Sequence, residues 1–275
     1  MNGKIKSILV SILVVGVVAA MLGVSTISWL SDEEKSVGNF LVAGSLDLKI
    51  DLVNSTHFRH NGTLIEWNSF DEKNLGREDR FFSWKDIKPG DYGEFTISLH
   101  LFDNPGYLYF NISNIVDTDN GINEPEDMVD GIVNNNDTTP DGDLDDYVYF
   151  YGWIDWGMTP GWQGPNEDPY EGNNVWDCGY PCHEPIIVRG NLSEVKNRSY
   201  NVSEAIKEVC ANSSGIMQPC KTIYIAIAWW IPGKDIGLGD YDPFHNGVPY
   251  PLPGAGNIIQ SDMWAADLTF YVEQI

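Results

Sequence analysis

Carboxylate side chains crowd two short stretches in the middle of the chain, Asp117–Asp127 and Asp141–Asp146. They are interspersed with Asn and Gly, residues that favour tight loops. A hard divalent cation such as calcium is bound by about six to eight oxygen atoms that loops of this kind can supply. We therefore expect a calcium site with ligands drawn from Asp117, Asp119, Glu126, Asp127, Asp141, Asp143 and Asp145.

The spacing of these carboxylates differs from that of an EF-hand loop. Gly121 comes one position too early, and no glutamate stands at the required distance from Asp117. The alternative is a solvated acidic loop that only keeps the protein soluble. So many carboxylates packed beside strands would repel one another strongly without a cation, and this repulsion favours the calcium site.

The chain as a whole is acidic, with 16 Lys and Arg residues against 40 Asp and Glu residues and a formal net charge of −24. Such a chain repels the phosphates of nucleic acids, so nucleic acid is excluded as a partner. Divalent cations are the natural ligands of this composition.

Catalytic motifs are not recognisable in the sequence. His57 and His60 form an H-x-x-H pair without the glutamate of a zinc protease, and no G-x-S-x-G is present. The five histidines are scattered, so no catalytic set can be assigned from spacing. We expect no enzymatic activity, and a secreted hydrolase is kept as an alternative.

The N-terminus has the order of a secretory signal. Lys4 and Lys6 precede the largely apolar run Ile8–Val24, and small residues up to Ser28 follow. Residues 1–28 are therefore interpreted as a signal peptide, and the mature protein is expected outside the cell or at its surface. Contact with the membrane would be limited to this segment before cleavage, the alternative being an anchor that is retained.

Cysteines and glycosylation sequons fit an exported chain. Four cysteines, Cys178, Cys182, Cys210 and Cys220, predict two disulfides, with 178–182 and 210–220 as the simplest of the possible pairings. A zinc site formed by Cys178, Cys182 and His183 is the alternative. Eight N-x-S/T sequons predict a glycosylated surface; they begin at Asn54, Asn61, Asn111, Asn136, Asn191, Asn197, Asn201 and Asn212.

Alternating apolar residues indicate that strands must position these groups. Phe95–Leu101 and Tyr107–Ile112 are joined by an Asn-Pro-Gly turn and are interpreted as a hairpin. The apolar run Thr222–Ile231 is expected to be a central strand. Further strands are predicted at Leu46–Leu52, Tyr147–Ile154 and Ala266–Val272, and a helix is predicted after an N-cap at Ser203.

These elements predict one all-β domain, a β-sandwich over residues 45–275 with one or two short helices. Long loop insertions are expected around residues 113–146, 157–220 and 232–262. Aromatic side chains on such loops could stack on sugars, so a monomeric calcium-bearing carbohydrate-binding module is kept as an alternative. They could equally be core residues or contacts between subunits. The tryptophans concerned are Trp153, Trp156, Trp162, Trp176 and Trp264.

Three stretches of the sequence resemble the camelysin and TasA-type secreted proteins. SDEEKSVGNFLVAGSLDLKID, from Ser31 to Asp51, is similar to the start of that family. IKPGDYGEFTISLHLFDNPGYLYFNISN and QSDMWAADLTFYVEQ are similar to its turn and hairpin and to its last strand. The central loops, the cysteines and most sequons lie outside the resemblance. The family includes bacterial biofilm matrix fibres and archaeal bundling pili, and calcium-dependent cannula tubes resemble them in fold.

The resemblance implies a jelly-roll-like sandwich whose N-terminal segment is donated to a neighbouring subunit as a strand. Residues 29–44 would be that donor segment, with Trp29, Leu30, Phe40 and Val42 as candidate anchors. The expected function is therefore that of a secreted structural subunit of an extracellular filament, pilus or tube, stabilised by calcium. Its expected partners are other copies of itself, neighbouring filaments and surface glycans. The alternative is that the whole stretch is a first strand packed in its own sandwich.

Overall fold

The structure, a computed structural model, describes residues 45–60, 63–76, 78–119, 142–160, 168–177, 183–210, 213–232 and 256–275. A division of the chain before Gly44 begins the compact unit of residues 44–275, which contains the described residues. This division lies one residue before the boundary predicted at Ser45. The predicted signal peptide and donor segment, including Trp29, Leu30, Phe40 and Val42, lie outside the described residues.

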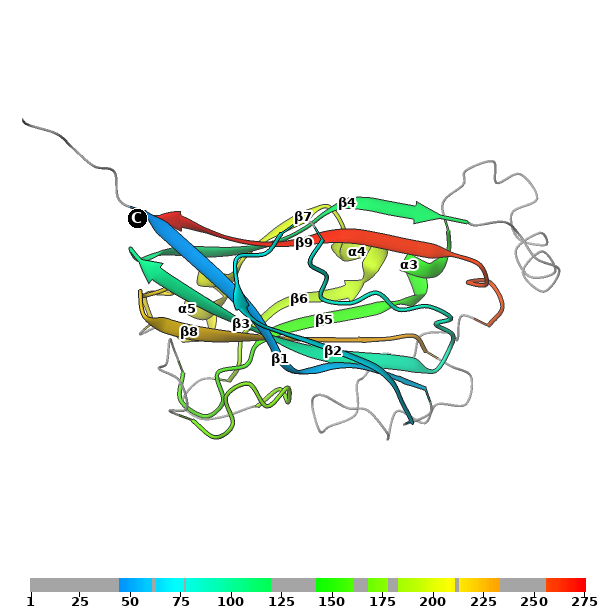
Figure 1. Cartoon of the computed structure of the whole chain (residues 1–275), viewed down its shortest axis with the longest axis horizontal. Coiled ribbons are helices and arrows are strands. Elements are labelled where there is room, and N and C mark those ends of the chain that lie inside the picture. The colour runs from blue at the N-terminus through cyan, green and yellow to red at the C-terminus, as the bar shows by residue number, and fades with distance from the viewer. Residues whose placement is uncertain are drawn as a thin grey trace, which may run out of the picture. The chain divides into compact units, whose positions relative to one another are not determined.

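Nine described strands form two antiparallel sheets (Figure 1). The six-stranded sheet has the order β2-β1-β3-β8-β5-β6. Its strands are β1 (Leu46–His60), β2 (Thr63–Lys73), β3 (Asp91–Asp103), β5 (Tyr149–Ile154), β6 (Ile186–Asn191) and β8 (Lys221–Trp230). The three-stranded sheet has the order β7-β4-β9, from β4 (Gly106–Thr118), β7 (Arg198–Asn201) and β9 (Met263–Gln274). The predicted all-β sandwich is confirmed.

The main core fills the space between the two sheets. Phe95, Ile97, Leu99 and Leu101 alternate along β3 and are fully buried, opposite Leu108–Ile112 of β4. Burying each such side chain contributes about 1.5 to 3 kcal/mol. Strand β8 lies between β3 and β5 and is buried on both faces, so the prediction of a central strand at 222–231 is confirmed.

The predicted hairpin between β3 and β4 is wrong. The two strands belong to different sheets, so the turn at 103–106 is an arch that carries the chain across the core. Gly106 is required at this arch, because a Cβ atom there would lie 2.4 Å from Val272 Cγ1 and 2.5 Å from the Glu273 carbonyl oxygen. Gly106 also exchanges two backbone hydrogen bonds with Met217.

Three short helices are described, α3 (Leu144–Tyr147), α4 (Leu192–Val195) and α5 (Val202–Val209). The N-cap of α5 is Asn201, whose side-chain oxygen accepts a hydrogen bond from the backbone N–H of Glu204. The predicted N-cap, Ser203, instead lies in the first turn and is buried. Its Oγ accepts the backbone N–H of Leu108 at 2.9 Å, so it attaches α5 to β4.

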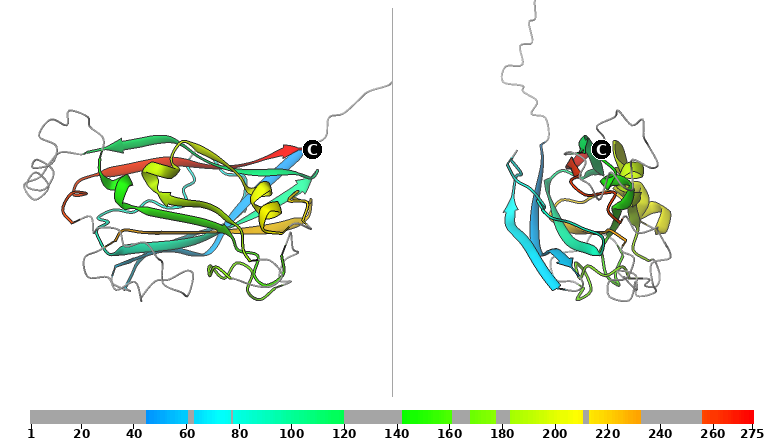
Figure 2. Two further views of the ribbon diagram at one scale, coloured as in Figure 1. Left: turned by 180° about the vertical axis from the view of Figure 1, so that it is seen from behind. Right: turned by 90° about the vertical axis from the view of Figure 1, so that its right-hand side faces the viewer.

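Three predicted ranges are corrected by the structure. The interval 157–220 is not only an insertion, because it contributes β6 to one sheet and β7 to the other (Figure 2). Residues 113–118 continue β4 and pair with β9. The first strand extends beyond Leu52 to His60, with an irregularity in its pairing to β3.

None of the described helices is long and apolar enough to cross a bilayer.

Candidate functional site

The N-terminal end of the domain is fixed by the arch between β3 and β4. Ser45 Oγ donates a hydrogen bond to Asp103 at 2.6 Å, and Asn104 Nδ2 donates to the carbonyl oxygen of Ser45 at 2.8 Å. Leu46 pairs with Asp103, and Gly106 pairs with Gln274. Strand β1 therefore begins at the same end of the sandwich at which β9 ends (Figure 1).

Four strands form the edges of the two sheets, and they differ in length and charge. β7 has 4 residues and β6 has 6. β2 has 11 residues and is charged along its final part, where Lys73 pairs with Asp79 at 2.5 Å. β9 has 12 residues and contains no Lys, Arg or Pro. Its charged residues, Asp267 and Glu273, are both exposed, so β9 is, among the described strands, a long edge without the Lys and Pro residues that often obstruct strand addition.

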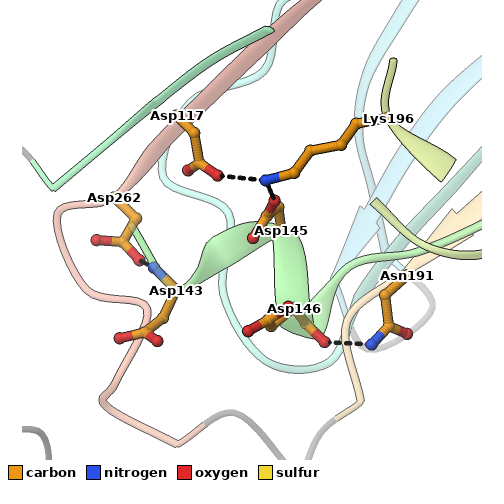
Figure 3. A network of polar contacts seen from close by, with 7 residues as sticks. All are labelled: Asp117, Asp143, Asp145, Asp146, Asn191, Lys196 and Asp262. Carbon is orange, nitrogen blue, oxygen red and sulfur yellow. Dashed lines mark hydrogen bonds and ion pairs between the residues drawn. The ribbon is translucent and has the colours of Figure 1, made fainter. Parts of the chain in front are cut away.

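Three charged residues meet where β4, α3 and the end of α4 come together (Figure 3). Lys196 Nζ lies 3.4 Å from Asp117 Oδ2 and makes a close contact with Asp145 Oδ2. The side chains of Asp117 and Asp145 retain only 10% and 5% of their exposure. Lys196 follows Asp117 by 79 positions, so sequence spacing gives no signal for this contact.

The electrostatics of this cluster are unevenly balanced. Burial, reinforced by the neighbouring Asp145, raises the pKa of Asp117 to about 6, although Lys196 acts in the opposite direction. Burial alone would lower the pKa of Lys196. The hydrogen bonds and negative charges of Asp145 and Asp117 outweigh burial, so the pKa of the lysine is raised. The single ammonium group is therefore the main compensation for two nearly buried carboxylates.

The remaining predicted calcium ligands are only partly assembled. Asp143 is next to α3, and its backbone N–H donates to Asp262 at 2.7 Å, while Asn191 Nδ2 donates to the Asp146 carbonyl at 2.7 Å (Figure 3). Asp119 follows β4, whereas Glu126, Asp127 and Asp141 lie outside the described residues. Within the described ranges, no group of three or more His, Cys, Asp or Glu residues is arranged to hold a metal ion.

A second acidic site, which sequence reasoning missed, lies in the loops that follow β5 and precede β6. Asp155 and Glu184 are both fully buried. Asp155 accepts the backbone N–H groups of Gly172 at 3.0 Å and Asn174 at 2.6 Å. Glu184 accepts those of Gly157 and Asp177, both at 2.8 Å. All four carboxylate oxygens therefore hold loop backbone against the sheet.

Burial dominates the titration of this pair. Burial raises the pKa of Asp155. Burial and the negative charge of Asp155 both raise the pKa of Glu184. The backbone N–H donors act against both shifts. Nearby Asp168 behaves differently. Burial would raise its pKa, but hydrogen bonds from Tyr170, Thr159 and Met158 outweigh burial and lower it.

The predicted pairing of Cys210 with Cys220 is wrong. Cys210 is disulfide-bonded, whereas Cys220 is a free, exposed thiol in a turn with positive φ. Cys178 and Cys182 lie outside the described residues, and His183, the third residue of the alternative zinc site, contacts the ring of Trp176. The exposed thiol of Cys220 is therefore not a structural cross-link.

The sequon asparagines lie in different surroundings. Asn197 is exposed in a turn, and Asn201 is exposed but caps α5. Asn191 already donates its side-chain amide to Asp146, and Asn111 is half-buried in the central strand of its sheet. Because a glycan needs a free side-chain amide, Asn197 offers the most accessible site among these four. The side chains of Asn54, Asn61, Asn136 and Asn212 are not described.

The tryptophans predicted to form a sugar-stacking surface are largely turned inward. Trp153 and Trp156 are fully buried, and Trp176 and Trp264 are half-buried. Trp153 packs with Tyr149, Tyr151 and Trp230 on the face of the six-stranded sheet that points away from the main core. For Trp153 and Trp156 the sugar-stacking interpretation is wrong and the alternative, that they are core residues, is confirmed. Trp162 lies outside the described residues.

No protein-family model matches this chain, and no curated protein matches it either.

Proposed function

We propose that the protein is a secreted structural subunit of an extracellular filament, pilus or tube, in which residues 29–44 of one copy complete a sheet of the next copy. The observation that carries this proposal is the unequal sandwich. Among the described strands, a sheet of three faces a sheet of six, and a further strand beside the smaller sheet would reduce this inequality. The resemblance of residues 31–51 to the TasA-type proteins supports the same reading.

Strand donation has a direct physical basis. An added strand makes main-chain hydrogen bonds with an open edge while its apolar side chains cover apolar neighbours. Donation from head to tail does not close on itself, so repetition produces a filament. Removal of residues 1–28 would free the donor segment from the membrane and so permit assembly only after export.

Calcium is proposed as a stabilising ion of the assembled or folded subunit. The described residues alone do not fit a calcium ion, since Lys196 stands between two of the predicted ligands. Any site must therefore use other carboxylates of the predicted set. Binding to the folded form would raise the melting temperature by mass action. An unchanged melting temperature after chelation and after addition of calcium would exclude this part of the proposal.

Electron microscopy tests the main proposal. A chain lacking residues 1–28 should form filaments or tubes, whereas a chain that begins at Ser45 should remain monomeric with an intact domain. Monodisperse particles from both chains would contradict the proposed function. Binding of such particles to polysaccharides would then favour the carbohydrate-binding alternative.

A further inference from the structure

The edge of β9 has the features of an acceptor for an added strand. Its 12 residues pair with β4 on one side, and it ends its sheet in the described part of the chain. In an antiparallel strand, alternate residues direct their N–H and C=O groups away from the paired neighbour. With no second strand paired to β9 in the described ranges, these groups form a row of main-chain donors and acceptors along its outer side.

The side chains of β9 point to the same conclusion. On its inner face, Phe270 is buried, but Trp264, Ala266, Leu268 and Val272 are only half-buried although they pack against the core. Leu46 and Leu48 at the beginning of β1 are half-buried as well. A strand alongside β9 would cover apolar side chains of this face, and in strand addition such side-chain contacts give specificity while the main-chain hydrogen bonds give affinity.

The segment 74–90 packs beside this strand through its side chains. The ring of Phe81 contacts Phe270 edge-on at 6.3 Å, and Asn68 Nδ2 donates to the carbonyl oxygens of Arg80 and Phe81. The backbone hydrogen bonds described for this segment are internal or go to Ile231 and not to β9. The segment therefore covers apolar side chains near β9 without pairing with its main chain.

Chain direction indicates where the added strand comes from. Because β1 begins and β9 ends at the arch, residues 29–44 of the same chain could run along β9 only in the parallel direction. Every described strand pair in this protein is antiparallel, and parallel pairs are slightly less stable. A segment from a neighbouring copy is free of this restriction. Extended, it would span about 50 Å, enough for the roughly 40 Å of β9.

We propose that the edge of β9 accepts residues 29–44 of a neighbouring copy as an antiparallel strand. This inference rests on the proposed function and adds the acceptor and the polarity of the contact. The segment from the neighbour would extend the order β7-β4-β9 by a fourth strand. Its apolar anchors would cover the half-buried inner face of β9.

Two adjacent alanines provide matched variants for a test. Ala266 is half-buried on the inner face of β9, whereas Ala265 is exposed on the outer face. An inward-pointing lysine on an edge strand can still reach water in the isolated subunit but not beneath an added strand. In chains lacking residues 1–28, Ala266→Lys should abolish filaments and Ala265→Lys should leave them unchanged.

Hydrogen exchange decides the assignment without a substitution. Amide protons of β9 should exchange more slowly in filaments than in the chain that begins at Ser45, which retains the compact unit, while those of β2 and β6 should be unchanged. Filaments whose β9 exchange is unaltered, or which form equally well with Ala266→Lys, would overturn the assignment of β9 and leave the proposed function standing. Absence of filaments from the unsubstituted chain would overturn the proposed function itself.

Discussion

Two regions of the molecule hold buried carboxylates by different means. Where β4 meets α3, Asp117 and Asp145 are compensated by the ammonium group of Lys196. In the loops around β5 and β6, Asp155 and Glu184 accept four backbone N–H groups. The first arrangement depends on one distant side chain, whereas the second depends on the path of the loop itself.

The difference shows how an acidic chain can bury negative charge. Removing a charge from water is expensive, and it is tolerated where an opposite charge or several hydrogen bonds replace the water. In the first region one ammonium group compensates part of the charge of two carboxylates, so its loss leaves both without an opposite charge. In the second region burial raises the pKa values of both carboxylates although the backbone donors act against it, so this site responds to pH and does not depend on a single basic residue.

The largest effect is expected from removing the cation. Lys196→Met keeps the length of the side chain but leaves Asp117 and Asp145 close together without compensation. We predict a loss of about 3 kcal/mol in the free energy of unfolding, measured by urea denaturation. Lys207→Met is the control, because Lys207 pairs with the exposed Glu204 and should contribute at most about 0.5 kcal/mol. Equal losses in the two variants would remove the distinction between the regions.

A smaller loss is expected at the second site from Glu184→Gln. The protonated Glu184 side chain keeps two oxygen atoms that can accept, whereas the amide has one oxygen and an NH2 group that only donates. The N–H of Gly157 or Asp177 therefore loses its partner. We predict a loss of about 2 kcal/mol, again measured by urea denaturation. The exposed Glu208→Gln on α5 should change stability by less than about 0.5 kcal/mol. If Glu184→Gln were neutral, the hydrogen bonds would not be what holds the loop.

The two arrangements also predict a pH dependence. Groups whose pKa is raised on folding favour the folded state at low pH and lose that contribution as pH rises from the unfolded value through the folded value. For Glu184 this window extends from 4.5 to about 9, and for Asp117 from 3.8 to about 6. The melting temperature should therefore be higher at pH 5.5 than at pH 8.5, and Glu184→Gln should reduce the difference. A melting temperature that rises over this interval would contradict the assignment.

The smallest effect is expected at Asp146. It lies next to Asp145 in α3, but the contact with Asn191 is made by its backbone carbonyl and not by its carboxylate (Figure 3). Asp146→Asn should change stability by less than about 0.5 kcal/mol in denaturation experiments. A loss comparable to that of Lys196→Met would mean that the whole acidic stretch, and not the pair at Lys196, is the structural unit.

The strands were predictable because alternation reflects burial directly. The uniform apolar run at 222–231 can only be satisfied in the middle of a sheet, and β8 lies there. The connection between β3 and β4 was not predictable, since Asn-Pro-Gly suits an arch as well as a hairpin. The choice between them depends on whether Leu101 and Leu108 share a sheet face or oppose each other across the core, which is a property of the whole fold.

The candidate sites were less predictable than the fold. Clustered carboxylates at 117–146 were visible in the sequence, but their cation comes from Lys196, far along the chain. Asp155 carried a signal that was overlooked, namely a carboxylate between Trp153 and Trp156 in an otherwise apolar run. An acidic residue in such surroundings indicates burial with dedicated hydrogen-bond donors. The N-cap was misplaced by two residues because Asn201 and Ser203 are both favourable capping residues.

The position of β1 has a mechanical consequence. Strand β1 has 15 residues and pairs with β2 on one side and β3 on the other. Ladder hydrogen bonds are perpendicular to the strand, so tension applied lengthwise at Ser45 loads many of them simultaneously in shear and does not unzip them one by one. A subunit pulled by its N-terminal segment would therefore resist extension as a clamp, with the load shared between β3 on one side and β2 on the other.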